Sequence, residues 1–471
     1  MVLIRSTLWA AAALAVTAAG GASAANLNVQ DKAALGAATH AAMQKLVDLY
    51  KAGAKKTSFG NTAGVEGAFD QNTISWYASG IMWDAAFRNS AMNGDKSQDQ
   101  VVGEAISEAS FGSTGDLLGG SMRTIQEKLR GKWNDDIAWW AIAMMSATDS
   151  YGLSATTPNS NGKTFLSIAE LTMQEMWEQW DPLCGGGVYW SRDRNAAKGK
   201  DYKSAITNAE AIVLGARLAV ATNNQTYLTW ASNAYNWMKT SQIVGTDWVV
   251  RDGMEATTCV VNTLDFSYTG GTLISGLAYM YKATKVQSYL DDAANIAKAA
   301  IAKYQTNGIL AETPCAVHTC TRDNVVYLPQ LAKGLGILYT VTTDAALKTS
   351  IQTIIDNTLT SAVKNCDDTW MCSRQWITAT APVAGAYDQY PTTELLLAAS
   401  AIHGATVAPA AAAGGLSSTG TGAAPASGAT PAAGGSNAGS TTSKPTSDSS
   451  TIVAGGSMVL AAVGVVVLGS L

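Results

Sequence analysis

The chain has 471 residues, of which only 14% are charged, and its formal net charge is −5. This mild acidity excludes a nucleic-acid binder, which needs a basic surface to displace counterions from phosphates. The hydrophobic share of 47% excludes a disordered chain, and the 44 glycines follow no three-residue repeat, which excludes a collagen.

Residues 1–24 read as a secretory signal peptide. Arg5 precedes an apolar stretch from Leu8 to Ala19, and Ala22-Ser-Ala24 then supplies the small residues that signal peptidase recognises. A membrane anchor is the alternative, but the apolar run is too short to span a bilayer. We therefore expect a secreted protein that is cut after Ala24.

Residues 25–403 are predicted to form the folded body, because apolar residues recur there at helical spacing. The predicted helices cover 31–52, 73–92, 98–129 with a break, 135–149, 161–180, 204–222, 225–241, 267–284, 286–304, 324–341, 344–364 and 391–403. The best strand signal is Gly187–Trp190. Paired helices in this number suggest an all-α (α/α)6 barrel with a cleft at one end. A two-domain helical bundle is the alternative, although no linker interrupts the body.

Asp135 and Asp136 open one of these predicted helices, directly after Asn134. Acidic residues are favoured where the first N–H groups of a helix are unpaired, so the pair could simply cap the helix. The functional alternative is glycoside hydrolysis, in which retaining enzymes use two carboxyls about 5–5.5 Å apart. Their mutual repulsion would leave one carboxyl protonated beside one ionised. Nearby tryptophans could stack on sugar rings or belong to the core.

Six cysteines lie in the body, an even number that predicts three disulfides in a secreted chain. Short spacings favour the pairs Cys315–Cys320 and Cys366–Cys372, which leaves Cys184–Cys259, but 15 connectivities are possible. A zinc site is the alternative; scattered histidines and the lack of a CxxC pair speak against it. We expect no metal and no cofactor. The sequon at Asn224 predicts an N-linked glycan.

The C-terminal region changes composition. Residues 404–450 are rich in Ala, Gly, Ser, Thr and Pro, which predicts a disordered stalk. Residues 451–471 form an apolar tail with no charged residue after it. A polar spacer before such a tail is typical of a GPI-attachment signal. We expect attachment at Asn437, with Ser447 as the second choice, so that the membrane is contacted through a GPI anchor only. GPI anchoring indicates a eukaryote, and the stalk suits a fungal cell wall.

Several segments in one order resemble glycoside hydrolase family 76, the α-1,6-mannanases, and in particular its fungal GPI-anchored cell-wall members. They are Trp76–Trp83, Asn134–Trp140, Cys184–Trp190, Asp201–Asn208, Ser267–Lys282 and Cys320–Asp323. The resemblance covers roughly residues 30–400. Three positions depart from the family pattern: Tyr77 replaces a Trp, Thr269 an Asn and Leu328 a Lys. These departures bear on the outer sugar-binding subsites.

The resemblance implies an (α/α)6 enzyme that cleaves α-1,6-linked mannose with retention, with Asp135 as nucleophile and Asp136 as acid/base. It implies substrate contacts from seven further residues: Asn134, Trp83, Trp139, Trp190, Asn208, Tyr268 and Asp323. The expected substrate is α-1,6-mannan or the glycan of a GPI anchor, and β-glucan is a possible acceptor for transfer. We expect a monomer on the outer face of the plasma membrane and in the cell wall.

A non-catalytic mannan-binding wall protein on the same fold is the alternative, in which the two aspartates only cap a helix. A serine hydrolase is not supported, because the chain has no Gly-x-Ser-x-Gly elbow. Turnover of α-1,6-mannan oligosaccharides by the wild type and by Asp135→Asn would separate the two readings.

Overall fold

The computed structural model describes residues 24–53, 67–70, 73–106, 133–156, 162–197, 199–312 and 322–405. All of them belong to the first of two compact units of the chain, residues 1–420. The predicted signal peptide, stalk, tail and attachment site therefore lie outside the described residues, apart from Ala24, Gly404 and Ala405.

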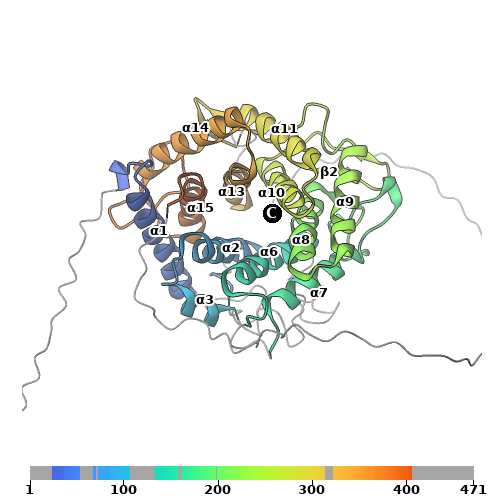
Figure 1. Ribbon diagram of the computed structural model, residues 1–471, viewed down its shortest axis with the longest axis horizontal. Coiled ribbons are helices and arrows are strands. Elements are labelled where there is room, and N and C mark those ends of the chain that lie inside the picture. The colour runs from blue at the N-terminus through green and yellow to red at the C-terminus, as the bar shows by residue number, and fades with distance from the viewer. Residues whose placement is uncertain are drawn as a thin grey trace, which may run out of the picture. The chain divides into compact units, whose positions relative to one another are not determined.

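Six helices form an inner ring in which each packs on the next and the last returns to the first (Figure 1). They are α2 (Trp76–Asn93), α6 (Asn134–Tyr151), α8 (Ala205–Thr222), α10 (Ser267–Thr284), α13 (Tyr327–Val341) and α15 (Ala386–His403). The outer helices are α1 (Lys32–Gly53), α3 (Asp99–Ala105), α7 (Phe165–Trp177), α9 (Gln225–Thr240), α11 (Gln287–Lys303) and α14 (Ala345–Ala362). This arrangement confirms the predicted all-α (α/α)6 barrel.

The inner helices are apolar nearly all round because they pack on both faces. The helix α8 is apolar and long enough to cross a membrane, yet 83% of it is buried inside the barrel. Where α10 crosses α13, a Cβ on Gly271 would lie 2.5 Å from the carbonyl oxygen of Gln330, so only glycine permits this approach. The small residues of these helices thus set the close packing of the ring.

Short strands lie in the loops that precede inner helices. An antiparallel sheet joins β1 (Tyr202–Ser204), β2 (Gly253–Glu255) and β3 (Val260–Val261), with Lys203 opposite Met254. A second pair is formed by β4 (Gln305–Thr306) and β5 (Ile309–Leu310). The strand expected at 187–190 is wrong: Val188 makes only an isolated bridge with Trp180.

Most helix boundaries follow the sequence prediction within a few residues. Of the range predicted at 98–129, the structure has only α3, which ends at Ala105 before an extended Ile106, and residues 107–132 lie outside the described residues. The last inner helix begins at Ala386, five residues before the predicted start at Pro391. Proline is favoured at the first helical position, where a missing N–H costs nothing. The structure instead accommodates it inside the helix.

Candidate active site

Asp135 and Asp136 lie in the first turn of α6, at the end of the barrel where the inner helices begin. The residue before this helix is Trp133, with an extended backbone (φ −106°, ψ 141°) and no side-chain capping bond. Neither Asn134 nor Asp135 is the N-cap, so that part of the helix-cap alternative is wrong; both aspartates lie in the first turn, where the helix dipole favours negative charge. Both aspartates are half-buried, which leaves them accessible to a substrate.

Two hydrogen bonds hold the carboxylate of Asp135. The indole Nε1 of Trp190 donates to Oδ2 at 2.9 Å, and the backbone N–H of Asp136 donates to Oδ1 at 3.0 Å. Burial raises the pKa of Asp135 to about 7 against these bonds, and the negative charge of Asp252 adds to the increase. Asp135 therefore changes its protonation near neutral pH.

Asp252 is a third carboxyl at this end, and sequence reasoning missed it. It directly precedes β2, and its Oδ2 accepts a hydrogen bond of 2.7 Å from the hydroxyl of Tyr202. The side-chain amide of Asn262 in turn donates to that hydroxyl at 2.5 Å. Burial raises the pKa of Asp252 although both partners oppose it. The only sequence signal was an acid before a glycine at the start of a short strand.

Aromatic rings surround the carboxyls as two stacked pairs. Trp190 stacks on Trp133 with ring centroids 3.9 Å apart, and Tyr268 stacks on Tyr327 at 4.0 Å. All four rings are half-buried, so they keep accessible surface. The pKa of Tyr268 is raised mainly by burial and also by the charges of Asp252 and Asp135, which places this tyrosine near the pair.

Two asparagines expected to bind substrate instead position the loop that carries Trp190. Asn134 is fully buried and donates to the carbonyl of Tyr189 at 2.7 Å. Asn208 is also fully buried, and it bonds both the N–H and the C=O of Val188 at 2.9 and 3.1 Å. Their assignment as substrate contacts is corrected: they hold the backbone that presents the Trp190 indole to Asp135.

Lys203 fixes the preceding part of the same loop. Its side chain is fully buried, and its ammonium donates to the carbonyls of Leu183, Gly186 and Asp181 at 2.6, 2.7 and 2.9 Å. Because residues alternate along β1, Lys203 points away from its neighbour Tyr202. The short strand β1 thus supplies both Lys203, which holds the loop, and Tyr202, which donates a hydrogen bond to Asp252.

A disulfide and a glycine run shape this loop further. Cys184 is bonded to Cys259, which links the loop to the β2–β3 hairpin. Gly187 has φ +100°, and a Cβ there would lie 2.7 Å from the ring of Trp237. The predicted Cys184–Cys259 and Cys366–Cys372 pairs are both confirmed. Cys315 and Cys320 lie outside the described residues.

The remaining predicted site residues fall in other places. Trp83 and Trp139 are 1% and 3% exposed, so their assignment as sugar-stacking rings is corrected to core packing. The indole of Trp83 donates to the carbonyl of Gly67 at 2.6 Å. Asp323 is in a 3-10 turn before α13, and its side chain lies outside the described residues. Asn224 is exposed at the start of α9, where a glycan has room.

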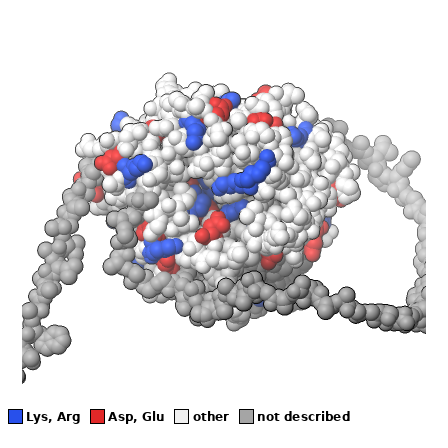
Figure 2. All heavy atoms as spheres, viewed as in Figure 1, with Lys and Arg blue, Asp and Glu red and all other residues white. Residues whose placement is uncertain are grey.

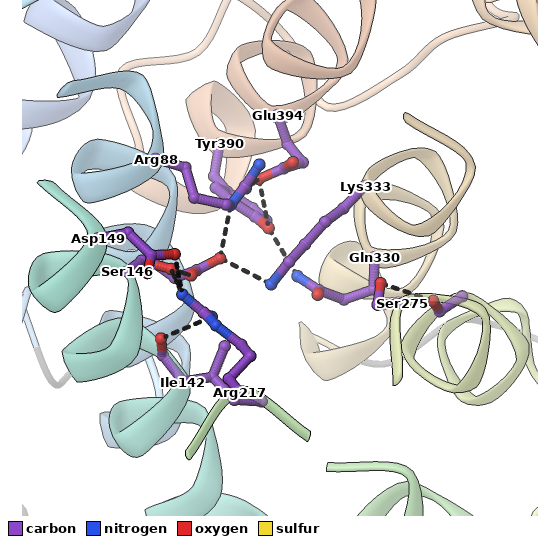
Figure 3. A network of polar contacts seen from close by, with 12 residues as sticks. Arg88, Ile142, Ser146, Asp149, Arg217, Ser275, Gln330, Lys333, Tyr390 and Glu394 are labelled. Atoms are coloured by element: carbon purple, nitrogen blue, oxygen red, sulfur yellow. Dashed lines mark hydrogen bonds and ion pairs between the residues drawn. The ribbon is translucent and has the colours of Figure 1, made fainter. Parts of the chain in front are cut away.

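The middle of the barrel holds a network of buried charges (Figure 3). Asp84 accepts hydrogen bonds from Ser146, Lys333 and Arg88 at 2.6, 2.7 and 2.9 Å, and Arg88 also binds Glu394. Burial alone would raise the pKa of Asp84, but the positive charges of Lys333 and Arg88 outweigh it and lower that pKa. The charges are thus paired within the fold.

This network borders a pocket of about 430 Å³, whose lining includes Arg88, Lys282, Lys333 and Asp149. Figure 2 shows Lys and Arg side chains gathered near the centre of one face, over the inner helices. Among these cations, Lys282 lies in the last turn of α10, where the helix dipole favours positive charge. Arg88 and Lys333 are held instead by Asp84.

The described residues contain no group of three or more His, Cys, Asp and Glu side chains placed to hold a metal ion.

A barrel of paired helices, with two successive carboxyls between stacked aromatic rings where its inner helices begin, defines a glycoside hydrolase of the (α/α)6 type. The chain belongs to glycosyl hydrolase family 76, whose sequence pattern matches residues 34–413. The resemblance seen in the sequence is thereby confirmed.

Named relatives and solved structures agree with this assignment. The mannan endo-1,6-alpha-mannosidase DCW1 of Saccharomyces cerevisiae is 27% identical over 374 residues, which is 77% of this chain and 80% of the relative. Dfg5 from Chaetomium thermophilum, solved with glucosamine, has a TM-score of 0.66 at 20% identity over 79% of this chain and 92% of its own. The α-1,6-mannanase GH76A of Salegentibacter sp. HEL1_6 has a TM-score of 0.61 at 18% identity over 78% and 99% of the two chains. A variant of that mannanase with two successive aspartates replaced by asparagine is inactive and was solved with α-1,6-mannotriose.

Proposed function

We propose that the protein is a retaining endo-α-1,6-mannosidase, able to transfer as well as hydrolyse, that acts on mannan or on GPI-anchor glycan during fungal cell-wall assembly. The observation that carries this proposal is the Asp135–Asp136 pair between stacked aromatic rings in a family 76 chain. The names of the relatives and the inactivity of a mannanase without two successive aspartates support it.

Asp135 is proposed as the nucleophile and Asp136 as the acid/base. The two hydrogen bonds onto Asp135 favour an ionised, fixed carboxylate, as a nucleophile requires. Its pKa of about 7 points the other way, towards a proton on Asp135 in the free enzyme. The assignment follows the hydrogen-bond pattern, since a proton held on the pair can pass to Asp136 when substrate binds. Rescue of the two alanine variants by an added nucleophile distinguishes the roles.

The reaction then runs in two displacements. A carboxylate oxygen of Asp135 attacks the anomeric carbon while Asp136 gives its proton to the departing glycosidic oxygen, which yields a glycosyl ester on Asp135. Asp136, now ionised, removes a proton from water or from a sugar hydroxyl, and that oxygen displaces Asp135 from the anomeric carbon. Asp136 ends protonated and the configuration is retained. Hydrolysis and transfer thus need the same residues and differ only in the acceptor.

The stacked rings are proposed as sugar platforms on either side of the pair. Trp133 and Trp190 adjoin Asp135, whereas Tyr268 and Tyr327 begin α10 and α13. The departures Thr269 and Leu328 lie beside these tyrosines. Thr269 is buried and donates to the carbonyl of Phe266 at 2.7 Å, so it supports the turn and is not free to bind a sugar.

Secretion, N-glycosylation at Asn224 and GPI anchoring at Asn437 complete the proposal. The fungal relatives named as mannan endo-1,6-alpha-mannosidases support a wall location. The composition of residues 404–471 supports the anchor. A monomeric enzyme with β-glucan as acceptor fits this setting, because a mannosyl ester can be intercepted by any sugar hydroxyl within reach.

Turnover of α-1,6-mannan oligosaccharides tests the proposal against the non-catalytic alternative. The wild type is expected to cleave them and Asp135→Asn is expected to lose this activity. Asp149→Asn is the matched control, because Asp149 lies on the same helix at its other end and pairs with Arg217 there. Equal rates for the wild type and Asp135→Asn would support the wall-binding alternative. Addition of a glucan acceptor then shows whether new transfer products form.

A further inference from the structure

Glu210 is a carboxyl inside the barrel that the reaction above does not use. It lies in α8, somewhat more than one turn after the first residue of the helix, in an otherwise apolar stretch. Its side chain is fully buried, and neither carboxyl oxygen has a hydrogen-bond partner among the described residues. Leaving a buried polar group without a partner is costly, and a leucine would fill the same space. Packing alone therefore gives no reason for an acid here.

The charged groups that act on Glu210 come from two other inner helices. They are Asp135 and Asp136 of α6, which packs against α8, and Lys333 of α13. Lys333 is bonded to Asp84 at 2.7 Å (Figure 3), so its charge is already paired. The helix α10, which packs on the other side of α8, contributes no charge that acts on Glu210. The strongest charges facing this carboxyl are therefore those of the catalytic pair.

Burial, and after it the negative charges of Asp135 and Asp136, raise the pKa of Glu210 well above its ordinary value. The protonated form of Glu210 is therefore favoured beside the pair. The ionisation of Glu210 and the ionisation of the pair each make the other less favourable.

This inference rests on the proposed function. We propose that Glu210 is a positioning residue of the catalytic pair, a buried carboxyl that can lose its proton in place of Asp136 and so keeps Asp136 in the acid form as the pH rises. When the solution turns alkaline, a base in the solvent takes a proton either from Asp136 or from Glu210. Molecules that lose it from Glu210 gain a negative charge beside Asp136, and they retain the proton that the departing sugar needs.

Glu210→Gln tests this role, because glutamine keeps the shape but cannot ionise. In this variant the alkaline limb of the pH profile of kcat/KM is expected to shift to lower pH. The ratio of activity at pH 8 to activity at pH 6 should therefore be about threefold lower than in the wild type. Glu210→Asp keeps a carboxyl and is expected to restore part of the difference. If Glu210→Gln is active and the alkaline limb of its kcat/KM profile has not shifted, the proposal is overturned.

Glu312→Gln is the matched control. Glu312 is also a buried acid near the start of an inner helix, and burial raises its pKa to about 7. It accepts a hydrogen bond from the N–H of Ser267 at 3.0 Å and is not among the groups that shift the pKa of Glu210. Its replacement is expected to leave the alkaline side of the profile in place. An equal displacement in Glu312→Gln would show that any buried acid has the effect, and would overturn a specific role for Glu210.

Melting temperatures measured across a range of pH report the protonation of Glu210 without any substrate. A carboxyl whose pKa is raised by folding costs nothing below its unfolded value, about 4.3, and destabilises the fold increasingly as the pH rises above it. Glu210→Gln is therefore expected to melt like the wild type at pH 4 and at progressively higher temperature than the wild type towards pH 8. A difference that does not change with pH contradicts a protonated Glu210. A wild type that is inactive on every mannoside overturns the proposed function, whereas an active wild type with an unmoved profile overturns only the role of Glu210.

Discussion

Trp190→Phe removes the indole N–H that donates to Oδ2 of Asp135 while it keeps an aromatic ring to stack on Trp133. Hydrogen bonds to charged groups contribute about 1.5–3 kcal/mol, so the ionised form of Asp135 loses stabilisation of this order. One pKa unit corresponds to about 1.4 kcal/mol. The pKa of Asp135, already raised by burial to about 7, is therefore expected to rise by about one further unit.

Because the nucleophile must be ionised, the acidic limb of the kcat/KM profile should shift to higher pH in Trp190→Phe. Activity at pH 6 should fall about fivefold more than activity at pH 8. The assay is hydrolysis of an aryl α-mannoside across this range. Asp252→Asn provides a control of opposite sign, because loss of that negative charge lowers the pKa of Asp135. If both variants move the profile in the same direction, or Trp190→Phe leaves it in place, Asp135 does not titrate as described.

Three further predictions concern the fold and its attachment. Lys203→Met leaves three backbone carbonyls without their donor, of which that of Gly186 is buried, and should lower the free energy of unfolding by about 2 kcal/mol in urea titrations, with Lys200→Met, exposed in part, as an unaffected control. Replacing Cys184 and Cys259 by serine opens a bridge with a sequence separation of 75 and should cost about 4 kcal/mol, against about 2 for the bridge with a separation of 6; equal costs would contradict the loop-closure argument. Truncation before Asn437 should release soluble protein into the medium, and mass-spectrometric detection of residues 458–471 on surface protein would refute the GPI reading.

The helices and their ring could be predicted from the sequence because apolar spacing and helix length are local properties. The bounds of α8 and α10 follow the apolar pattern closely. The start of α15 could not be predicted, since proline is favoured at a helix start and tertiary packing tolerates it within the helix. The prediction of a strand at 187–190 was wrong because side chains such as that of Asn208, and not a neighbouring strand, bond the backbone of this segment.

Only those residues of the candidate site that form a recognisable sequence motif could be predicted. Asp135 and Asp136 stand together in the sequence, and the structure places Trp190 against them. A helical pattern does not tell a tryptophan in the core from one at the surface, so Trp83 and Trp139 were misassigned. Asp252 and Glu210 come from distant segments that only folding brings to the pair. The sequence signal for Glu210 was a lone acid within an apolar helix.

The central claim, that Asp135 and Asp136 form the two carboxyls of a retaining glycosidase, is tested most directly by azide rescue on an activated aryl α-mannoside. Asp136→Ala lacks the acid/base, but a good leaving group departs without protonation and azide needs no base to attack the glycosyl-enzyme. The account predicts that azide restores turnover of Asp136→Ala with the α-mannosyl azide as product, whereas Asp135→Ala is not rescued to that product. An α-azide from Asp135→Ala would reverse the two roles, and wild-type rates in both alanine variants would contradict the claim itself.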